Sequence, residues 1–275
     1  MLNRPDTLQT PRGRWRPAPA IQVSIGLHAL GAAVLVFQPG AWPWVLAVLV
    51  ANHLVLSTAV LWPRGRLLGP NLVRLAPAAA ARGEIALTFD DGPDPQVTPR
   101  VLDLLDQYGM KASFFCIGIK AQAYPEIVKD IARRGHSVEN HSHRHSHGFA
   151  FFGLARLARD VEAAQATIAG IVGCAPRFFR APAGFRSPLL DPVLARRHLR
   201  YASWTRRSYD TVRTDPHAAL STLTRGLAAG DVLLLHDGSA ARTAAGIPMV
   251  LAVLPALLDT LSNRGLKSVA LPSAV

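Results

Sequence analysis

Cysteine is scarce in this chain, and its scarcity excludes a disulfide framework. Only Cys116 and Cys174 are present among 275 residues, whereas small disulfide-rich domains carry several pairs. Cys116 lies inside an apolar run, residues 112–118, that predicts a buried strand. We therefore interpret both cysteines as small hydrophobic core residues. The hydrophobic content of 49% is sufficient for a substantial core in one or two domains.

Acidic residues are also few. The 18 Asp and Glu stand against 30 Lys and Arg, which gives a formal net charge of +12. Such a charge suits nucleic acid, an anionic membrane surface or a phosphorylated substrate. The sequence has neither zinc-finger spacing nor the aromatic and basic pattern of an RNA-binding domain. Because several of the arginines flank an apolar N-terminal region, we expect membrane lipids as a partner and no nucleic acid.

Charge is absent altogether from residues 17–63. The Gln-Pro-Gly sequence at 38–40 divides this stretch into two apolar segments, residues 20–37 and 42–62. Each is close to the roughly 20 residues that a membrane-spanning helix needs. Tryptophans near both ends of the second segment favour the membrane interface. The pattern predicts a transmembrane helical hairpin, with a cleaved signal sequence or a re-entrant pair as alternatives.

Arginines lie on both sides of the predicted hairpin, and the turn between its segments is uncharged. By the positive-inside rule both flanks face the cytoplasm. We therefore expect a multi-pass protein of the cytoplasmic membrane whose large C-terminal portion is cytoplasmic. The flanking arginines are Arg4, Arg12, Arg14 and Arg16 before the hairpin and Arg64, Arg66, Arg74 and Arg82 after it. The expected divisions are a basic tail (1–16), two transmembrane helices (17–63), a basic, Ala-rich linker (64–83) and a domain (84–275).

Short apolar runs alternate with amphipathic helical patterns after the linker. Repeated alternation of strands and helices implies a parallel sheet, so we expect an α/β fold. The predicted strands are residues 85–89, 113–117, 137–140, 178–180, 201–204, 232–235 and 268–271.

Two adjacent carboxylates follow the first predicted strand. Asp90 and Asp91 begin the sequence Asp-Asp-Gly-Pro-Asp-Pro, and adjacent side chains at a strand end point in different directions. One carboxylate can therefore bind a metal while the other faces a substrate. The same residue types are common in surface turns, which is the alternative interpretation of this motif alone.

Four alternating histidines follow the third predicted strand, in residues 141–147. His141 and His145 can converge on one ion if the chain makes a helical turn here. Together with Asp91 they form a two-His, one-carboxylate set that leaves positions open for water and substrate. A solvated loop or strand face that binds metals loosely is the alternative. We assign no role to His143 and His147.

An arginine and a histidine lie at the ends of two further predicted strands. Arg180 can hold a carboxylate ionised and oriented, or it is a surface arginine before a Pro-Gly loop. His236 ends a buried apolar strand, where a lone histidine is more often structural than catalytic. By themselves these two segments leave both roles open.

Five motifs, taken in order, resemble the polysaccharide deacetylase family, which is carbohydrate esterase family 4 with the NodB homology domain. They are residues 88–93, His141-Ser142 with His145, residues 180–188, Trp204 with Asp210, and residues 234–237. The resemblance implies a distorted (β/α)7 barrel, preceded here by the transmembrane hairpin. It also implies a hydrolase of carbon–nitrogen bonds that removes N-acyl groups from carbohydrates.

The resemblance further implies roles for individual residues. Asp91, His141 and His145 would bind a divalent metal, usually zinc. Asp90 would be the general base that activates water, and Arg180 would orient it. These roles agree with what the residue types alone allow.

On the leaving-group side, the resemblance makes His236 the general acid that protonates the amine, with Asp210 assisting it. Thr211 stands where the family usually has a tryptophan that lines the patch for the acetyl methyl group. The acyl group is therefore open between N-acetyl and N-formyl. Residues expected to bind the substrate are Pro182, Gly184, Trp204 and Leu234.

The expected cytoplasmic position decides the substrate class. A cytoplasmic domain does not reach finished wall polymer, so we expect an N-acylated amino sugar on a lipid-linked precursor such as a polyprenyl phosphate. The alternatives are an extracytoplasmic peptidoglycan or chitin deacetylase, a hydrolase of cyclic imides or small amides, and a non-catalytic sugar-binding membrane module.

Overall fold

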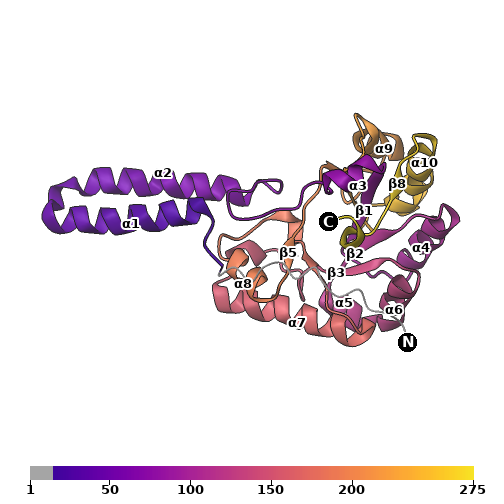
Figure 1. Cartoon of the computed structure of the whole chain (residues 1–275), viewed down its shortest axis with the longest axis horizontal. Helices are drawn as coiled ribbons and strands as arrows, with labels where there is room; N and C mark the ends of the chain where they lie inside the picture. The colour runs from indigo at the N-terminus through magenta and orange to yellow at the C-terminus, as the bar shows by residue number, and fades with distance from the viewer. Residues whose placement is uncertain (1–14) are drawn as a thin grey trace.

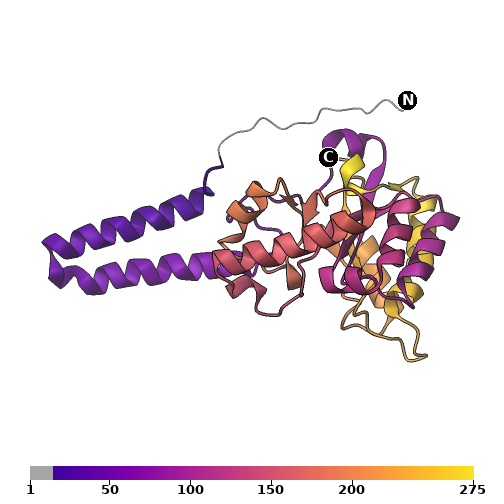
Figure 2. The same ribbon diagram turned by 90° about the horizontal axis from the view of Figure 1, so that it is seen from below.

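A helical hairpin projects from an α/β domain in the computed structural model, which describes residues 15–275 (Figure 1). Helices α1 (Pro19–Phe37) and α2 (Trp42–Val60) are joined by the short η1 (Pro39–Ala41) and run side by side in both views (Figure 1 and Figure 2). Both are long and apolar enough to cross a membrane. Only 6% of the apolar stretch of the first helix and 0% of that of the second are buried. Most of the predicted basic tail, including Arg4, Arg12 and Arg14, lies outside the described residues.

Small and polar side chains hold the two hairpin helices together. A Cβ at Gly31 would lie 2.8 Å from Val45 Cγ1, so the glycine permits a close approach of the helices. Asn52 Nδ2 donates to Ser24 Oγ at 2.9 Å. This bond satisfies a polar group in the middle of an apolar helix. The packing fits the predicted hairpin.

One curled, parallel sheet forms the centre of the α/β domain. Its strand order is β5-β4-β3-β2-β1-β7-β6, with β8 paired to the beginning of β1. The strands are β1 (Glu84–Asp90), β2 (Ala112–Cys116), β3 (Ser137–Asn140), β4 (Phe178–Phe179), β5 (Arg200–Tyr201), β6 (Arg206–Arg207), β7 (Val232–His236) and β8 (Lys267–Ser268). This architecture confirms the expected distorted barrel fold with an N-terminal helical pair.

Helices surround the sheet, as the alternating pattern predicts (Figure 1). In α6, for example, Val128 and Ile131 are buried and the polar residues face outward. α10 packs against both α4 and α9. The helices are α3 (Pro77–Ala81), α4 (Thr98–Gln107), α5 (Gly118–Ala123), α6 (Pro125–Arg133), α7 (Leu154–Val172), α8 (Leu190–Arg196), α9 (Pro216–Thr224) and α10 (Met249–Asn263), with short η2 (Phe149–Phe151), η3 (Pro182–Gly184) and η4 (Leu271–Ser273).

Side chains of β1 alternate between two buried clusters. Ile85, Leu87 and Phe89 pack with the surrounding helices, whereas Ala86 belongs to an inner cluster that includes Phe115, Trp204 and Leu234. By this period of two, Thr88 and Asp90 share the inner face. The alternation thus directs Asp90 into the barrel interior.

The segment expected to be a linker also pairs with the sheet. Leu72 forms a parallel bridge with Ala202, just after β5, and Arg74 forms an antiparallel bridge with Asp231, just before β7. Asp231 also accepts from Arg206 in β6, at 2.6 Å, and from Arg74, at 2.6 Å. Residues 72–75 therefore lie along the open side of the curled sheet. The domain limits at 64 and 84 stay predictions.

The two cysteines differ in their surroundings. Cys116 is fully buried in β2, as expected. Cys174 is exposed, so its interpretation as a core residue is wrong. The reason is local: Gly173 caps the C-terminus of α7 with a left-handed φ of 75°, and Cys174 lies in the exposed segment between α7 and β4.

Candidate metal and catalytic site

The sheet brings the predicted site residues together at the carboxyl ends of its strands. Asp90 ends β1 and His236 ends β7, and these two residues are directly paired in the register of the sheet. His141 follows β3, and Arg180 follows β4. Because the strands are parallel, their ends meet at one edge, as in other α/β barrels.

Asp91, His141 and His145 form a compact cluster. One ligand atom from each lies within 4.8 Å of the others. The Nε2 atoms of His141 and His145 lie 3.2 Å and 2.9 Å from Asp91 Oδ1. The structure therefore brings together the three residues that the sequence predicts as metal ligands.

The protonation pattern of this cluster suits a cation. His141 Nδ1 donates to the Arg180 carbonyl oxygen at 2.9 Å, which leaves a lone pair on Nε2 of the neutral ring. Asp91 Oδ1 is buried, and no hydrogen bond of good geometry reaches it from the described residues, although both imidazole nitrogens are close. A buried carboxylate oxygen on which two imidazole nitrogens converge is the kind of donor set that a divalent metal requires.

The pKa shifts in the cluster have the same electrostatic origin. Burial alone would raise the pKa of Asp91, but His141 and His145 outweigh burial and hold that pKa well below its usual range. Burial alone would lower the pKa of His141, but Asp90 and Asp91 outweigh it and raise that pKa. The cluster therefore favours an ionised carboxylate and positive charge beside it.

A loop, not a helical turn, brings His141 and His145 together. Ser142 and His145 have left-handed φ values of 65° and 49°. Asn140 Oδ1 accepts from the Ser142 backbone N–H at 2.9 Å, and Ser142 Oγ accepts from that of His145 at 3.0 Å. These side chains compete with helical bonding, so His141 and His145 converge without the helical turn that we took as the condition for it.

Asp90 has a different partner from its neighbour. Arg180 Nη1 donates to Asp90 Oδ1 at 2.6 Å and to Thr88 Oγ1 at 2.9 Å. Arg180 is fully buried, and its Nη2 donates to the Ser203 carbonyl oxygen at 2.9 Å. The guanidinium also lies 4.0 Å from the centre of the Phe115 ring. Arg180 is thus buried and bonded to Asp90, and it is not a surface arginine.

His236 is held by a buried carboxylate. Its Nδ1 donates to Asp210 Oδ1 at 2.7 Å, and its backbone N–H donates to Asp210 Oδ2 at 2.9 Å. Burial alone would lower the pKa of His236, but Asp210 outweighs burial and raises it. The arrangement leaves Nε2 free to give a proton to a substrate.

A cavity of 470 Å³ joins these groups. Of the residues nominated from the sequence, it is lined by Asp90, Asp91, His141, His145, Gly184, Trp204, Leu234 and His236. Arg180 and Asp210 lie fully buried behind it, and Pro182 begins η3 without lining it. Thr211 lines the cavity at the position where the family usually has tryptophan.

Other contacts with the cluster were not expected from the sequence. Lys120 Nζ donates to the Asp91 carbonyl oxygen at 2.8 Å. Asp237, in the loop after β7, accepts from Thr98 Oγ1 at 2.5 Å, and burial raises its pKa to about 7. The sequence contains one signal for this contact, the Asp-Gly pair that begins with Asp237. Gly238 allows the loop after β7 to lie close to the Asp91 backbone.

Comparisons with known proteins agree with this geometry. The sequence model of the family described as polysaccharide deacetylase matches residues 78–202. The chain is 31% identical over 187 residues to a peptidoglycan-N-acetylglucosamine deacetylase of Bacillus cereus, covering 67% of this chain and 84% of the relative. It is 32% identical to a chitooligosaccharide deacetylase of Sinorhizobium fredii, covering 66% and 86% of the two chains.

Solved structures share the fold. The Bc1960 peptidoglycan N-acetylglucosamine deacetylase superposes with a TM-score of 0.67 at 26% identity, covering 74% of this chain and 92% of the other. A family 4 carbohydrate esterase from Streptomyces lividans, in complex with acetate, gives a TM-score of 0.61 at 33% identity and covers 68% and 91%.

Proposed function

Because the chain belongs to the polysaccharide deacetylase family and is a carbohydrate deacetylase, we propose that it hydrolyses the N-acyl amide of a lipid-linked amino sugar. The observation that carries the proposal is the single cavity at which Asp91, His141 and His145 meet Asp90 and His236. The metal cluster, the proposed proton acceptor Asp90 and the proposed proton donor His236 thus line the same cavity.

A metal fits the cluster, since the orphaned Asp91 oxygen and the two imidazoles form a two-His, one-carboxylate set. Bound there, a divalent ion, by ligand type Zn²⁺, would polarise the amide carbonyl and lower the pKa of water. Arg180 holds Asp90 in a fixed orientation through the 2.6 Å bond. Asp90 then accepts the proton of the attacking water as general base.

The second half of the reaction needs a proton donor. An amine is expelled from a tetrahedral intermediate only when its nitrogen is protonated. His236 provides that proton from Nε2, because Asp210 binds Nδ1–H and stabilises the imidazolium. Gly184, Trp204 and Leu234 line the cavity and would position the sugar and acyl group.

The base of the hairpin supports a membrane-bound substrate. A Cβ at Gly184, in the wall of the catalytic cavity, would lie 3.2 Å from Pro63, just after α2. Arg64 Nη1 donates to the carbonyl oxygen of Thr205 at 3.2 Å, next to Trp204. The end of the apolar hairpin therefore contacts the loops that form the site. We propose that the cavity opens at the membrane surface.

Exposed apolar side chains on the same loops support this placement. Phe185 and Leu189 follow β4, and Tyr209 and Val212 follow β6. All four are exposed, Val212 by 74%. Apolar groups gathered at the rim of a site are typical of contact with a membrane or partner. With Arg64 and the other basic flanks, they fit the proposed multi-pass protein of the cytoplasmic membrane with a cytoplasmic site.

Release of acyl product from matched substrates tests the proposal. The full chain in detergent would be incubated with a polyprenyl-phosphate N-acetylhexosamine, its N-formyl analogue and peptidoglycan, and acetate and formate would be measured. We expect turnover of a lipid-linked sugar and none with His141→Ala. Turnover of peptidoglycan alone would reject the lipid-linked substrate.

That outcome would favour the second candidate, an extracytoplasmic polymer deacetylase. The names of the Bacillus cereus and Sinorhizobium fredii relatives, a peptidoglycan and a chitooligosaccharide deacetylase, support it.

A further inference from the structure

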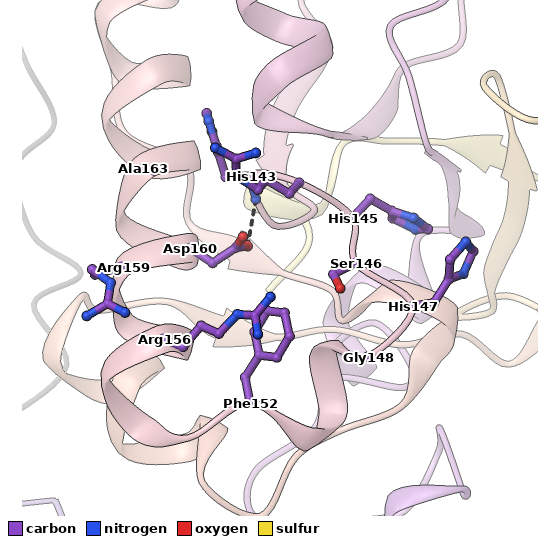
Figure 3. A pocket seen from close by; sticks show the side chains of 11 residues that line it. His143, His145, Ser146, His147, Gly148, Phe152, Arg156, Arg159, Asp160 and Ala163 are labelled. Carbon is purple, nitrogen blue, oxygen red and sulfur yellow. Dashed lines mark hydrogen bonds between the residues drawn. The ribbon is translucent and has the colours of Figure 1, made fainter.

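A second hollow, of 860 Å³, lies beside the catalytic cavity (Figure 3). The loop of residues 143–148 forms one wall, and Phe152 with the first turns of α7 forms the other. In Figure 3, His145 and His147 lie on one side of this loop, and Arg156 and Asp160 lie on the other. Nothing in the deacetylation chemistry uses this hollow.

The hollow is cationic. Arg144, Arg156 and Arg159 line it, and Asp160 is the one carboxylate among its lining residues. Asp160 Oδ1 already accepts from the His143 backbone N–H at 2.8 Å. The next acid on α7, Glu162, pairs with Arg197 at 2.6 Å. The local positive charge is therefore left for a ligand.

One of the guanidinium groups is preorganised. Arg156 stacks on the Phe152 ring, with Cζ 3.6 Å from the ring centre (Figure 3). Stacking fixes the plane of the group and leaves its N–H edge available for paired hydrogen bonds. Such an edge matches the oxygens of a phosphate or carboxylate.

The hollow and the catalytic cavity share part of their lining. Arg144, His145 and His147 line both spaces, and His145 belongs to the metal cluster. The loop of residues 143–148 therefore lies between the two spaces. A ligand with its amide at the cluster would reach the arginines across the edge of this loop.

We propose that this hollow binds a phosphate group that is esterified to the amino sugar. The inference rests on the proposed deacylase function and names the anionic part of its substrate. A phosphate gives the arginines a charged, multidentate acceptor that a neutral oligosaccharide lacks. The same chemistry occurs in anionic lipid headgroups, so the test must separate these two sources.

Two glycosides that differ only by a phosphate provide the test. Octyl N-acetylglucosaminide and octyl N-acetylglucosaminyl phosphate would be given to the full chain in uncharged micelles, and KM would be measured from acetate release. We expect a KM about tenfold lower for the phosphate. Arg156→Ser and Arg144→Ser should bring the ratio of the two KM values towards one. Arg100→Ser, an exposed change on α4 outside both spaces, should keep the wild-type ratio.

Each outcome decides the proposal. An unchanged ratio in Arg156→Ser, or an equal rise of both KM values, would overturn it. A wild-type ratio of one, with vesicle binding that depends on both Arg156 and anionic phospholipid, would assign the hollow to headgroups instead. If neither glycoside releases acetate, the deacylase function fails. In that case, calorimetry of the octyl phosphate glycoside with wild type and with Arg156→Ser tests separately whether the hollow binds phosphate.

Discussion

Asp90 and Asp91 are adjacent in the chain, yet their carboxylates have different partners. Asp90 ends β1 inside the barrel and binds Arg180. Asp91 has a left-handed φ of 70°, which turns its carboxylate towards His141 and His145. Strained backbone of this kind persists where the surroundings hold it, and it is common at functional sites. The turn is what separates the proposed metal ligand from the proposed proton acceptor.

Replacing Asp90 by asparagine should remove the base and keep the metal cluster. The amide has nearly the shape of the carboxylate but does not take a proton from water, so kcat should fall about a hundredfold to ten-thousandfold. Metal content, measured by atomic absorption after dialysis, should stay at the wild-type ratio. An Asp90→Asn variant with wild-type kcat would show that Asp90 is not the base.

His141→Ala should give the opposite result. It removes one of the three proposed ligands and the Nδ1 donor to the Arg180 carbonyl, so the metal should dissociate and turnover should disappear. His236→Gln is the matched histidine change outside the cluster, and it should lose turnover with its metal retained. Equal metal content in both variants would contradict the assignment of ligands.

The alkaline limit of activity should depend on Asp210. Asp210 raises the pKa of His236 above its ordinary value against the opposing effect of burial. In the proposed mechanism the protonated ring is the donor, so kcat should fall as pH rises through that raised pKa. Asp210→Asn removes the charge and should move this fall to lower pH in a pH–rate profile. An unmoved alkaline limb would reject His236 as the acid.

The bond between His236 and Asp210 also stabilises the folded protein more at low pH than at high pH. Because the pKa of His236 is higher in the folded than in the unfolded protein, this contribution to the free energy of unfolding is complete below the unfolded pKa of about 6.5. It is lost as pH rises through the folded pKa.

At the scale of elements, the sequence predicts best where apolar runs are long. The expected strands at 85–89, 113–117 and 232–235 agree with β1, β2 and β7 to within about one residue at each end. β6 was not expected, because two half-buried arginines show no apolar alternation. The sequence does not predict the loop around His145, because the bonds of Asn140 and Ser142 that shape it appear only in three dimensions.

Gly184→Ala tests how tightly the rim loop is packed. Gly184 has φ of 77°, and an added Cβ would lie 2.6 Å from the Trp204 ring and 3.2 Å from Pro63. We expect a loss of about 1–3 kcal/mol from strain and overpacking, measured as a lower thermal midpoint, together with weaker substrate binding. Gly173→Ala is the control, since Gly173 has φ of 75° but open space around it. An equal loss in both variants would mean that strain alone accounts for it.

For the whole molecule, hairpin and barrel are joined at the loops that form the site. The sequence predicts the hairpin from the uncharged stretch 17–63, the parallel sheet from the strand pattern and the barrel from the family resemblance. It does not predict the Pro63–Gly184 approach or the pairing of residues 72–75, because both join segments more than 100 residues apart. If the hairpin spans a membrane, these contacts place the site loops next to it, so the substrate depends on which side of the bilayer the loops occupy.

Cys174 offers a direct measurement of that side. It is exposed, whereas Cys116 is fully buried and burial raises the pKa of its thiol, so a maleimide should label Cys174 alone. If both ends of the hairpin are cytoplasmic, a membrane-impermeant maleimide should label the protein only after the cells are permeabilised. Cys174→Ser should abolish the label in both conditions. Labelling of intact cells would place the catalytic cavity outside the cytoplasm, and a wall polymer would then be the substrate to test first.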